Sequence, residues 1–269
     1  MEEVTLATLN IAAPSKQRGR RLLDEWILRS SYDVYVFTET SEGEGTDLII
    51  SSFRSAGWRV FQRPGVPGDR GVTIATRIKA ESPQYPVDDP LPGRSIIINL
   101  EARPLVQLVA MYVPNRGNDG LKIERKRSFL DSWLHYLAQK APTNPQRVLV
   151  GDLNVVPTSQ HPEFLPQHVF ENRWYEQLES HAGLYDAALI HHRSHESTWM
   201  AHTGEGYTYD HIMPAKGLRD RVIAFAYDHS PRLSMKVSDH SALILKMNFD
   251  SVAYLHRHRP AELKQMDLL

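Results

Sequence analysis

The stretch Val148-Leu149-Val150-Gly151-Asp152-Leu153-Asn154 decides how the rest of this chain is interpreted. Aliphatic residues that stop at a glycine predict a buried strand whose end is open to solvent. The side chains of Asp152 and Asn154 are two positions apart, so both should point to the same side of that strand end. Such a pair suits polar chemistry, but Asp and Asn also end many strands because they hydrogen-bond their own backbone. Whether Asp152 and Asn154 form a site or only a turn depends on the residues at the other strand ends.

Composition describes an ordinary globular protein. The chain has 269 residues, of which 41% are hydrophobic, enough for a substantial core in one large α/β domain or two small ones. Lys and Arg number 31 against 32 Asp and Glu, so the net charge of -1 offers no global attraction to a polyanion. Any contact with nucleic acid must then come from a local basic face.

The absence of cysteine limits the chemistry further. A Cys count of 0 removes disulfides, thiolate metal sites and cysteine nucleophiles, and leaves His, Asp, Glu and Asn as possible ligands. Oxygen ligands favour a hard cation such as Mg²⁺ or Mn²⁺. Because no basic segment precedes a long apolar one and no apolar run could span a bilayer, we expect a soluble, cytoplasmic protein with no membrane partner.

Two earlier strands end in polar residues of the same kind. Residues 4–11 alternate apolar and polar side chains, as a half-buried strand does, and Asn10 lies near their end. The apolar run 34–37 leads directly into Glu39, which puts a second carboxylate at the end of a buried strand. An amide and two carboxylates therefore follow three predicted strands.

Amphipathic segments predict helices that pack on these strands. Apolar residues recur at helical spacing in four segments: 17–29, 48–56, 123–141 and 174–182. Gly183 is expected to end the last of these helices. We expect loops at 41–47 and 157–172. Further strands are predicted at 58–61, 71–75, 95–100, 106–113, 197–200, 206–213, 222–227 and 242–247.

Seven short motifs, in their order along the chain, resemble the endonuclease/exonuclease/phosphatase superfamily of metal-dependent phosphoesterases. This superfamily includes exonuclease III-like abasic-site nucleases, deadenylases, inositol phosphatases and sphingomyelinases. Each motif is short, but their order makes the set specific, and the resemblance extends to Met247. The motifs are Thr8-Leu9-Asn10-Ile11, Thr38-Glu39-Thr40, Tyr112-Val113-Pro114-Asn115, Gly151-Asp152-Leu153-Asn154, Thr198-Trp199, Asp210-His211 and Ser238-Asp239-His240.

The resemblance implies a fold and a domain arrangement. The fold would be α/β (α+β), a four-layer sandwich of two mainly antiparallel or mixed β-sheets flanked by helices, with the site at one end. The domain would span residues 1–250, leaving 251–269 as a C-terminal tail.

The resemblance also implies a metal centre. Asn10, Glu39 and Asp239 would be the metal ligands of Mg²⁺ or Mn²⁺, which suits a cation that keeps several waters and binds few protein groups directly. The bland alternatives are that Asn10 forms a turn and that Glu39 is a surface residue.

Catalytic roles follow from the same resemblance. Asp152 and Asn154 would activate and orient the attacking water. Asp239 would orient His240, whose imidazole would donate to a phosphate oxygen as negative charge builds in the transition state.

Two further catalytic residues are implied, with one departure from the family. Tyr112 would add a phenolic hydrogen bond to the phosphate, although it could equally be a core aromatic with its hydroxyl at the rim. Asp210 would lie on the leaving-group side or on the metal. Many nucleases of the family carry Arg two residues before this Asp, where this chain has Thr208, so a guanidinium that could clamp the phosphate is missing.

Substrate contacts are expected from Asn115, Asn154, Trp199 and His211. The last of these, His211, could be a ligand or a partly buried histidine. No zinc site is expected from the remaining histidines, because they lack paired spacing and are predicted to line surface loops: His161, His168, His191, His192, His195 and His202.

The function implied is a Mg²⁺-dependent phosphodiesterase that uses an activated water, most plausibly a DNA-repair endonuclease or exonuclease acting on DNA or RNA. Clusters of Arg and Lys in 17–21, 122–127 and 219–221 and at Arg116 could contact the phosphate backbone or form solvated faces. Two alternatives remain: a phosphatase or phosphodiesterase of a small-molecule or lipid phosphoester, and a non-catalytic binding protein on the same fold. The sequence leaves open the phosphoester that is cut, endo versus exo action and the oligomeric state.

Overall fold

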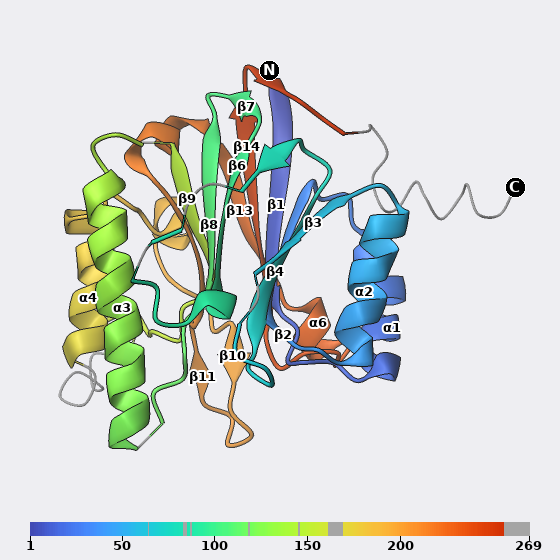
Figure 1. The fold of residues 1–269 in the computed structure, drawn as a ribbon, viewed down its shortest axis with the longest axis horizontal. Helices are drawn as coiled ribbons and strands as arrows, with labels where there is room; N and C mark the ends of the chain where they lie inside the picture. The colour runs from blue at the N-terminus through green and yellow to red at the C-terminus, as the bar shows by residue number, and fades with distance from the viewer. Residues whose placement is uncertain are drawn as a thin grey trace, which may run out of the picture.

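Two β-sheets packed face to face form the centre of the computed structural model, with helices on both outer faces (Figure 1). The structure describes residues 1–63, 65–82, 85–86, 88–117, 119–144, 146–160 and 169–255. The α/β sandwich of two sheets that the sequence predicts is confirmed.

The larger sheet has six strands, which are, in spatial order, β13 (Val222–Asp228), β14 (Ala242–Phe249), β1 (Glu2–Asn10), β2 (Val34–Thr40), β4 (Gly71–Thr76) and β3 (Arg59–Gln62). Neighbouring strands are antiparallel except for β1 and β2, which run parallel. The strands predicted at 58–61 and 71–75 are the antiparallel β3–β4 pair.

The second sheet has five strands in the order β12 (Asp210–Pro214), β9 (Arg147–Asp152), β8 (Val106–Tyr112), β6 (Ser95–Leu100) and β5 (Ala80–Glu81). Here β8 and β9 are the parallel pair and the other neighbours are antiparallel. Two short pairs complete the described strands: β10 (Trp199–Met200) with β11 (Gly206–Tyr207), and β7 (Ala102–Arg103) with β15 (Ser251–Val252).

The first residues of the predicted tail belong to this β-structure. Ser251 and Val252 pair with Arg103 and Ala102, so the chain continues to add backbone hydrogen bonds to the domain past residue 250. The rest of the tail from residue 256 lies outside the described residues, and the division at residue 250 stays a prediction.

Helices cover the outer face of each sheet (Figure 1). On the six-stranded sheet lie α1 (Lys16–Glu25) and α2 (Glu44–Ser55), and on the five-stranded sheet lie α3 (Gly120–Lys140) and α4 (Val169–Ser180). Shorter helices are α5 (Ala187–His191), α6 (Ser230–Leu233) and the 3₁₀ turns Ile27–Arg29, Pro92–Arg94 and Lys216–Arg221. Among the described residues, no helix is both long enough and apolar enough to cross a membrane.

Each central strand divides its side chains between two cores. In β1, Leu6 packs between the sheets while Leu9 packs toward α1 and α2. In β8, Leu108 packs between the sheets while Val109 packs toward α3 and α4. Successive strand residues point to opposite faces, so these strands are apolar on both sides and buried by a sheet on one and helices on the other.

Helix starts are where the sequence predictions differ most from the structure. The segment expected as a loop, 41–47, already contains the first turn of α2, which begins at Glu44 after the extended Gly43. The acidic side chains of Glu44 and Asp47 lie in that first turn, where the positive end of the helix dipole favours them. Similarly, α4 begins at Val169 within the predicted 157–172 loop, of which 161–168 lie outside the described residues.

Candidate active site

The carboxyl-terminal ends of four strands meet at one end of the sandwich. Because β1 and β2 run parallel, Asn10 pairs with Thr38, next to Glu39. Because β8 and β9 run parallel, Tyr112 pairs with Asp152. The antiparallel β12 starts at the same place, with Asp210 opposite Asp152, so residues far apart in sequence share one edge.

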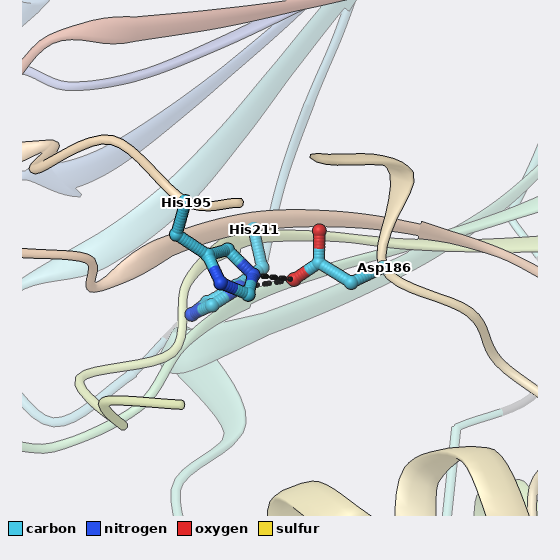
Figure 2. Close-up of side chains that lie close together, drawn as sticks. All are labelled: Asp186, His195 and His211. Atoms are coloured by element: carbon cyan, nitrogen blue, oxygen red, sulfur yellow. Dashed lines mark hydrogen bonds and ion pairs between the residues drawn. The ribbon is translucent and has the colours of Figure 1, made fainter. Parts of the chain in front are cut away.

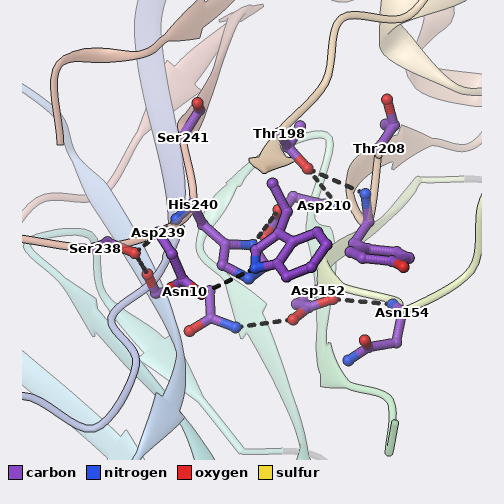
Figure 3. Close-up of polar contacts among 12 residues, drawn as sticks. Asn10, Asp152, Asn154, Thr198, Thr208, Asp210, Ser238, Asp239, His240 and Ser241 are labelled. Carbon is purple, nitrogen blue, oxygen red and sulfur yellow. Dashed lines mark hydrogen bonds and ion pairs between the residues drawn. The ribbon is translucent and has the colours of Figure 1, made fainter. Parts of the chain in front are cut away.

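Four of the predicted residues form one connected cluster. The buried Asn10 donates from Nδ2 to Asp152 Oδ2 at 2.8 Å, as Figure 3 shows, and to Glu39 Oε1 at 3.1 Å. The hydroxyl of Tyr112 donates to the same Glu39 oxygen at 3.0 Å. The hydroxyl of Tyr112 therefore faces the site, and the amide of Asn10 links the two carboxylates from opposite sheets.

The backbone is strained at two of the site residues. Glu39 and Asn154 have φ angles of +53° and +48°, in the left-handed region that non-glycine residues seldom adopt. Gly151, before Asp152, has φ +134°, and a Cβ there would lie 2.1 Å from the Met111 carbonyl oxygen, so only glycine lets β9 approach β8 this closely. Strain of this kind persists only where surrounding contacts hold it.

Asn154 is held by contacts that the sequence did not reveal. Its backbone N–H donates to Asp152 Oδ1 at 2.9 Å and its Nδ2 to the Val113 carbonyl at 2.9 Å. Its own carbonyl accepts from the buried Lys126 Nζ at 2.6 Å, and Lys126 pairs with Glu171 at 2.8 Å. The signal for Lys126 was present, since it lies one helical turn before the buried Phe129 and Leu130 on the apolar face of α3.

The predicted partner of His240 is corrected by the structure. His240 Nδ1 shares a 2.7 Å hydrogen bond with Asp210 Oδ2, whereas Asp239 Oδ2 accepts from Trp199 Nε1 at 2.9 Å (Figure 3 shows the labelled Asp210, Asp239 and His240). Asp239 lies in a bend directly before His240, and its carboxylate is engaged by the Trp199 indole and not by the neighbouring ring. The residue that orients the imidazole is Asp210.

Two hydroxyl groups hold this dyad in place (Figure 3). Thr198 Oγ1 accepts from the backbone N–H groups of Tyr209 and Asp210 at 3.0 and 3.2 Å. Ser238 Oγ accepts from the His240 N–H at 3.0 Å and donates to the Asn10 carbonyl at 2.6 Å. The dyad is therefore tied to both sheets.

Burial and mutual repulsion shift the acid–base properties of the site. Burial, followed by the charge of Asp210, raises the pKa of Asp152 to about 7. Burial lowers the pKa of His240, but the carboxylates of Asp210 and Asp152 outweigh it and raise that pKa to about 9. Burial also raises the pKa of Tyr112, with help from the charge of Glu39, so its hydroxyl remains a proton donor.

The residues present fit a divalent cation. Asp152 and Asp210 offer carboxylate oxygens within 4.8 Å of each other, and Asn10 joins Asp152 to Glu39. Buried Asp210 Oδ1 has no hydrogen-bond partner among the described residues, a costly state for a carboxylate oxygen. Three neighbouring carboxylates and an amide are oxygen donors of the kind that Mg²⁺ and Mn²⁺ prefer. The described contacts of Asp239 lead to Trp199 and not to Asn10 or Glu39, so Asp239 is the least supported of the three predicted ligands.

A second His–Asp cluster lies outside this site and favours the alternative that His211 is a buried histidine over a substrate contact. Asp186 Oδ2 makes hydrogen bonds with His211 Nδ1 at 2.7 Å and His195 Nε2 at 3.2 Å (Figure 2), and accepts from the Tyr175 hydroxyl at 2.8 Å. His211 is 1% exposed and its Nε2 lies 3.2 Å from the Val155 carbonyl, so its ring cannot reach a substrate. His195, expected on a surface loop, has a side chain that is only 2% exposed.

The remaining predicted residues have simpler surroundings. Asn115 is exposed and its side chain accepts from the Gly117 N–H at 2.9 Å, beside a hollow of about 380 Å³ that is also lined by Lys122 and Arg125. The Thr208 hydroxyl donates to the Glu196 carbonyl at 2.7 Å, so it does not replace a guanidinium. His161 and His168 lie outside the described residues.

Comparisons with known proteins agree with this geometry. The model of the Endonuclease/Exonuclease/phosphatase family matches residues 7–240. Among solved structures, the 3′ phosphatase NExo from Neisseria, bound to a product DNA hairpin, is similar with a TM-score of 0.75 and 18% identity, covering 92% of this chain and 100% of that one. An AP endonuclease from Archaeoglobus fulgidus is similar with a TM-score of 0.73 and 24% identity, at 92% and 100% coverage. An AP endonuclease from Leishmania major has a TM-score of 0.68 and 18% identity, at 91% and 88% coverage. The comparison with curated protein sequences gave no match.

Proposed function

Because this chain belongs to the endonuclease/exonuclease/phosphatase family and is a phosphoester hydrolase, we propose that it is a Mg²⁺- or Mn²⁺-dependent phosphodiesterase that cleaves DNA or RNA with an activated water. One observation carries the proposal. Asn10, Glu39 and Asp152 form a connected cluster at the strand ends, directly beside the Asp210–His240 dyad.

Asp152 is the proposed general base. One of its oxygens is fixed by Asn10 and the other by the Asn154 backbone, which sets the orientation of the carboxylate. A raised pKa makes a carboxylate a stronger base near neutral pH, and general bases typically contribute a factor of about 10² to 10⁴ to the rate. We propose that Asp152 takes a proton from water as the water attacks phosphorus, with the side chain of Asn154 orienting that water.

His240 is the proposed donor to the phosphoryl group. Its Nδ1 is engaged by Asp210, which fixes the ring, so Nε2 is the atom that can meet a phosphate oxygen. The raised pKa keeps the ring protonated near neutral pH, and such a donor stabilises charge that grows in the transition state. The phenolic hydroxyl of Tyr112 would assist from the opposite sheet.

Glu39 and Asn10 are the proposed metal ligands, with Asp239 as a third. When bound, a divalent cation would neutralise charge on the phosphoryl oxygens as a Lewis acid. Glu39 is suited to this because its Oε1 already gathers the Asn10 amide and the Tyr112 hydroxyl at one point. Asp152 is separated from Glu39 only by the Asn10 amide, so the base and the metal ligands would act on the same phosphate.

A nucleic acid is the proposed substrate class. The hollow beside Tyr112 is lined by Arg94, Lys122 and Arg125, cationic side chains that suit backbone phosphates flanking the one that is cut. One structural neighbour was solved with a product DNA hairpin and two are described as AP endonucleases. We therefore propose that the protein acts in DNA repair in the cytoplasm.

A substrate panel tests the proposal. The panel comprises an abasic duplex, single-stranded DNA, a 3′-phosphate end, RNA and small phosphoesters, each incubated with Mg²⁺ and with EDTA. We expect cleavage of a nucleic acid that requires Mg²⁺. Hydrolysis confined to small or lipid phosphoesters would replace the nuclease with the alternative phosphatase, and cleavage that persists in EDTA would contradict metal dependence.

A further inference from the structure

Three aromatic side chains form a stacked cluster that the hydrolytic chemistry does not use. Trp199 and Tyr207 face each other across the β10–β11 pair with ring centroids 6.0 Å apart. Tyr209 lies 5.6 Å from Trp199 and 5.7 Å from Tyr207, and the two tyrosine rings are nearly parallel, at 19°. The β10–β11 hairpin projects beyond the ends of the central strands (Figure 1). We call these three residues the aromatic cluster.

The aromatic cluster is not part of the hydrophobic interior. All three side chains are only partly buried, and none belongs to the three hydrophobic cores of the described chain. By contrast, Trp133 and Trp174 are 0% and 2% exposed in the core under α3 and α4. Stacked rings that keep solvent-accessible surface outside a core are suited to contact a planar ligand.

Two residues of the aromatic cluster are connected to the proposed active site. Trp199 donates from Nε1 to Asp239 at 2.9 Å and forms a backbone bridge with His240. Tyr209 directly precedes Asp210, and its carbonyl accepts from the Leu153 N–H at 2.8 Å.

Tyr209 also borders a hollow next to the site. This hollow of about 190 Å³ is lined by Tyr209, Asn154, Asn115, Arg116 and the buried Lys126–Glu171 pair. An aromatic residue, an amide that we assign to the attacking water and two cationic side chains therefore border the same space. This combination suits a nucleotide, which carries a planar base next to an anionic phosphate.

We propose that the aromatic cluster stacks on an unpaired nucleobase next to the scissile phosphate, so that the preferred substrate is single-stranded nucleic acid with an intact base. The inference rests on the proposed nuclease function and gives it a substrate class. Every base has a π face, so stacking gives affinity without sequence preference. An abasic nucleotide has no ring to stack, and a base inside a duplex is already stacked on its neighbours.

A pair of matched strands tests the inference. Each strand has a single natural phosphodiester among phosphorothioate linkages, flanked either by adenosines or by tetrahydrofuran abasic residues. Binding is measured by fluorescence anisotropy in EDTA, and cleavage is then measured with Mg²⁺. Stacking of one base changes affinity by a factor of roughly 5 to 150, so we expect the adenosine strand to bind about tenfold more tightly or better.

Variants on the hairpin assign that preference to the rings. Tyr207→Ala removes the ring that stacks on Trp199 and Tyr209, and we expect it to reduce the base preference to within about threefold. Tyr207→Phe keeps the ring and should keep the preference. Met200→Ala, on the same hairpin and outside the aromatic cluster, is the matched control and should change neither binding nor turnover. A thermal unfolding curve of each variant checks that the hairpin change leaves the domain folded.

The outcomes separate this inference from the proposed function. Equal binding and cleavage of both strands, or equal weakening of both by Tyr207→Ala, would overturn the stacking proposal while leaving a nuclease. A base preference in binding without cleavage of any nucleic acid would support stacking and contradict the nuclease function.

Discussion

The described residues include two His–Asp clusters, one containing Asp210 and the other its neighbour His211, which differ in how their carboxylates are used. In one, Asp210 bonds His240 through Oδ2 while its buried Oδ1 has no described hydrogen-bond partner. In the other, Asp186 Oδ2 makes hydrogen bonds with His211, His195 and Tyr175, and Oδ1 accepts from the Ala188 N–H (Figure 2).

This difference separates the proposed active site from a structural cluster of Asp186, His195, His211 and Tyr175, which we call the hub. The buried carboxylate of Asp186 accepts hydrogen bonds at both oxygens and is satisfied without a ligand, and its partners include residues of α4, α5 and β12, which it holds together. A buried carboxylate oxygen without a partner is costly unless a ligand supplies one. Identical residue types thus support chemistry in one place and stability in the other.

The comparison predicts the largest effect at Asp152 and His240. We expect Asp152→Asn and His240→Ala each to reduce kcat by about a hundredfold or more, with little change in KM, because both groups act on charge that appears only in the transition state. Steady-state kinetics on a cleaved substrate measures this. Near-normal kcat with a raised KM in either variant would make that residue a substrate anchor.

A substitution in the hub should lower the free energy of unfolding and leave turnover nearly unchanged. Asp186→Asn removes the negative charge that faces two histidines, and breaking a buried ion pair of this kind costs about 3–5 kcal/mol. Urea unfolding of the wild type and the variant gives the difference in unfolding free energy. The kcat of the folded variant should stay within a few-fold of the wild type, and an unchanged unfolding free energy would refute the structural role.

Substitution of a proposed metal ligand should have a smaller effect, which appears in the Mg²⁺ requirement. Glu39→Gln removes one anionic ligand without changing volume, and we expect the Mg²⁺ concentration for half-maximal rate to rise about tenfold. Glu42→Gln, which neutralises an exposed carboxylate three residues away, is the matched control. An unchanged metal requirement in Glu39→Gln would remove Glu39 from the ligands.

The smallest effect is a pH dependence of the hub. Burial opposes ionisation of Asp186, but His195 and His211 hold its pKa well below the usual range, so its contribution is present above about pH 4 and lost in acid. Burial likewise opposes protonation of His211, but Asp186 raises its pKa, so that contribution is present below about pH 6.5 and lost as pH rises through the raised value.

The stability difference between the wild type and Asp186→Asn should therefore be larger at about pH 5 than at about pH 9. Unfolding curves at the two pH values, in the same buffer and salt, measure this change. A difference that grows toward alkaline pH would contradict the ion pair.

The sequence was sufficient for the parts of the site that depend on a single strand end. Asn10, Glu39 and Asp152 were predicted as a group because each follows an apolar strand, and the parallel pairs β1–β2 and β8–β9 bring them to one edge. The two sheets and the outer helices were predicted in the same way, from hydrophobic periodicity and the resemblance together.

The assignments that failed depend on packing between distant segments. Choosing Asp210 over Asp239 as the partner of His240 requires the β9–β12 register and the side on which each side chain emerges. The burial of His211 depends on α4, whose Tyr175 meets the same carboxylate. No periodicity within one segment reports such contacts.

The most direct test of the account compares His240→Gln with His211→Gln, because the two residues are of the same type and each bonds a buried aspartate. For both variants, kcat and the unfolding free energy are measured in parallel. We expect the folded His240→Gln variant to lose turnover by about a hundredfold, and His211→Gln to lose stability while the folded enzyme keeps its turnover. A stable His211→Gln variant that loses turnover as severely as His240→Gln would contradict the distinction between the site and the hub.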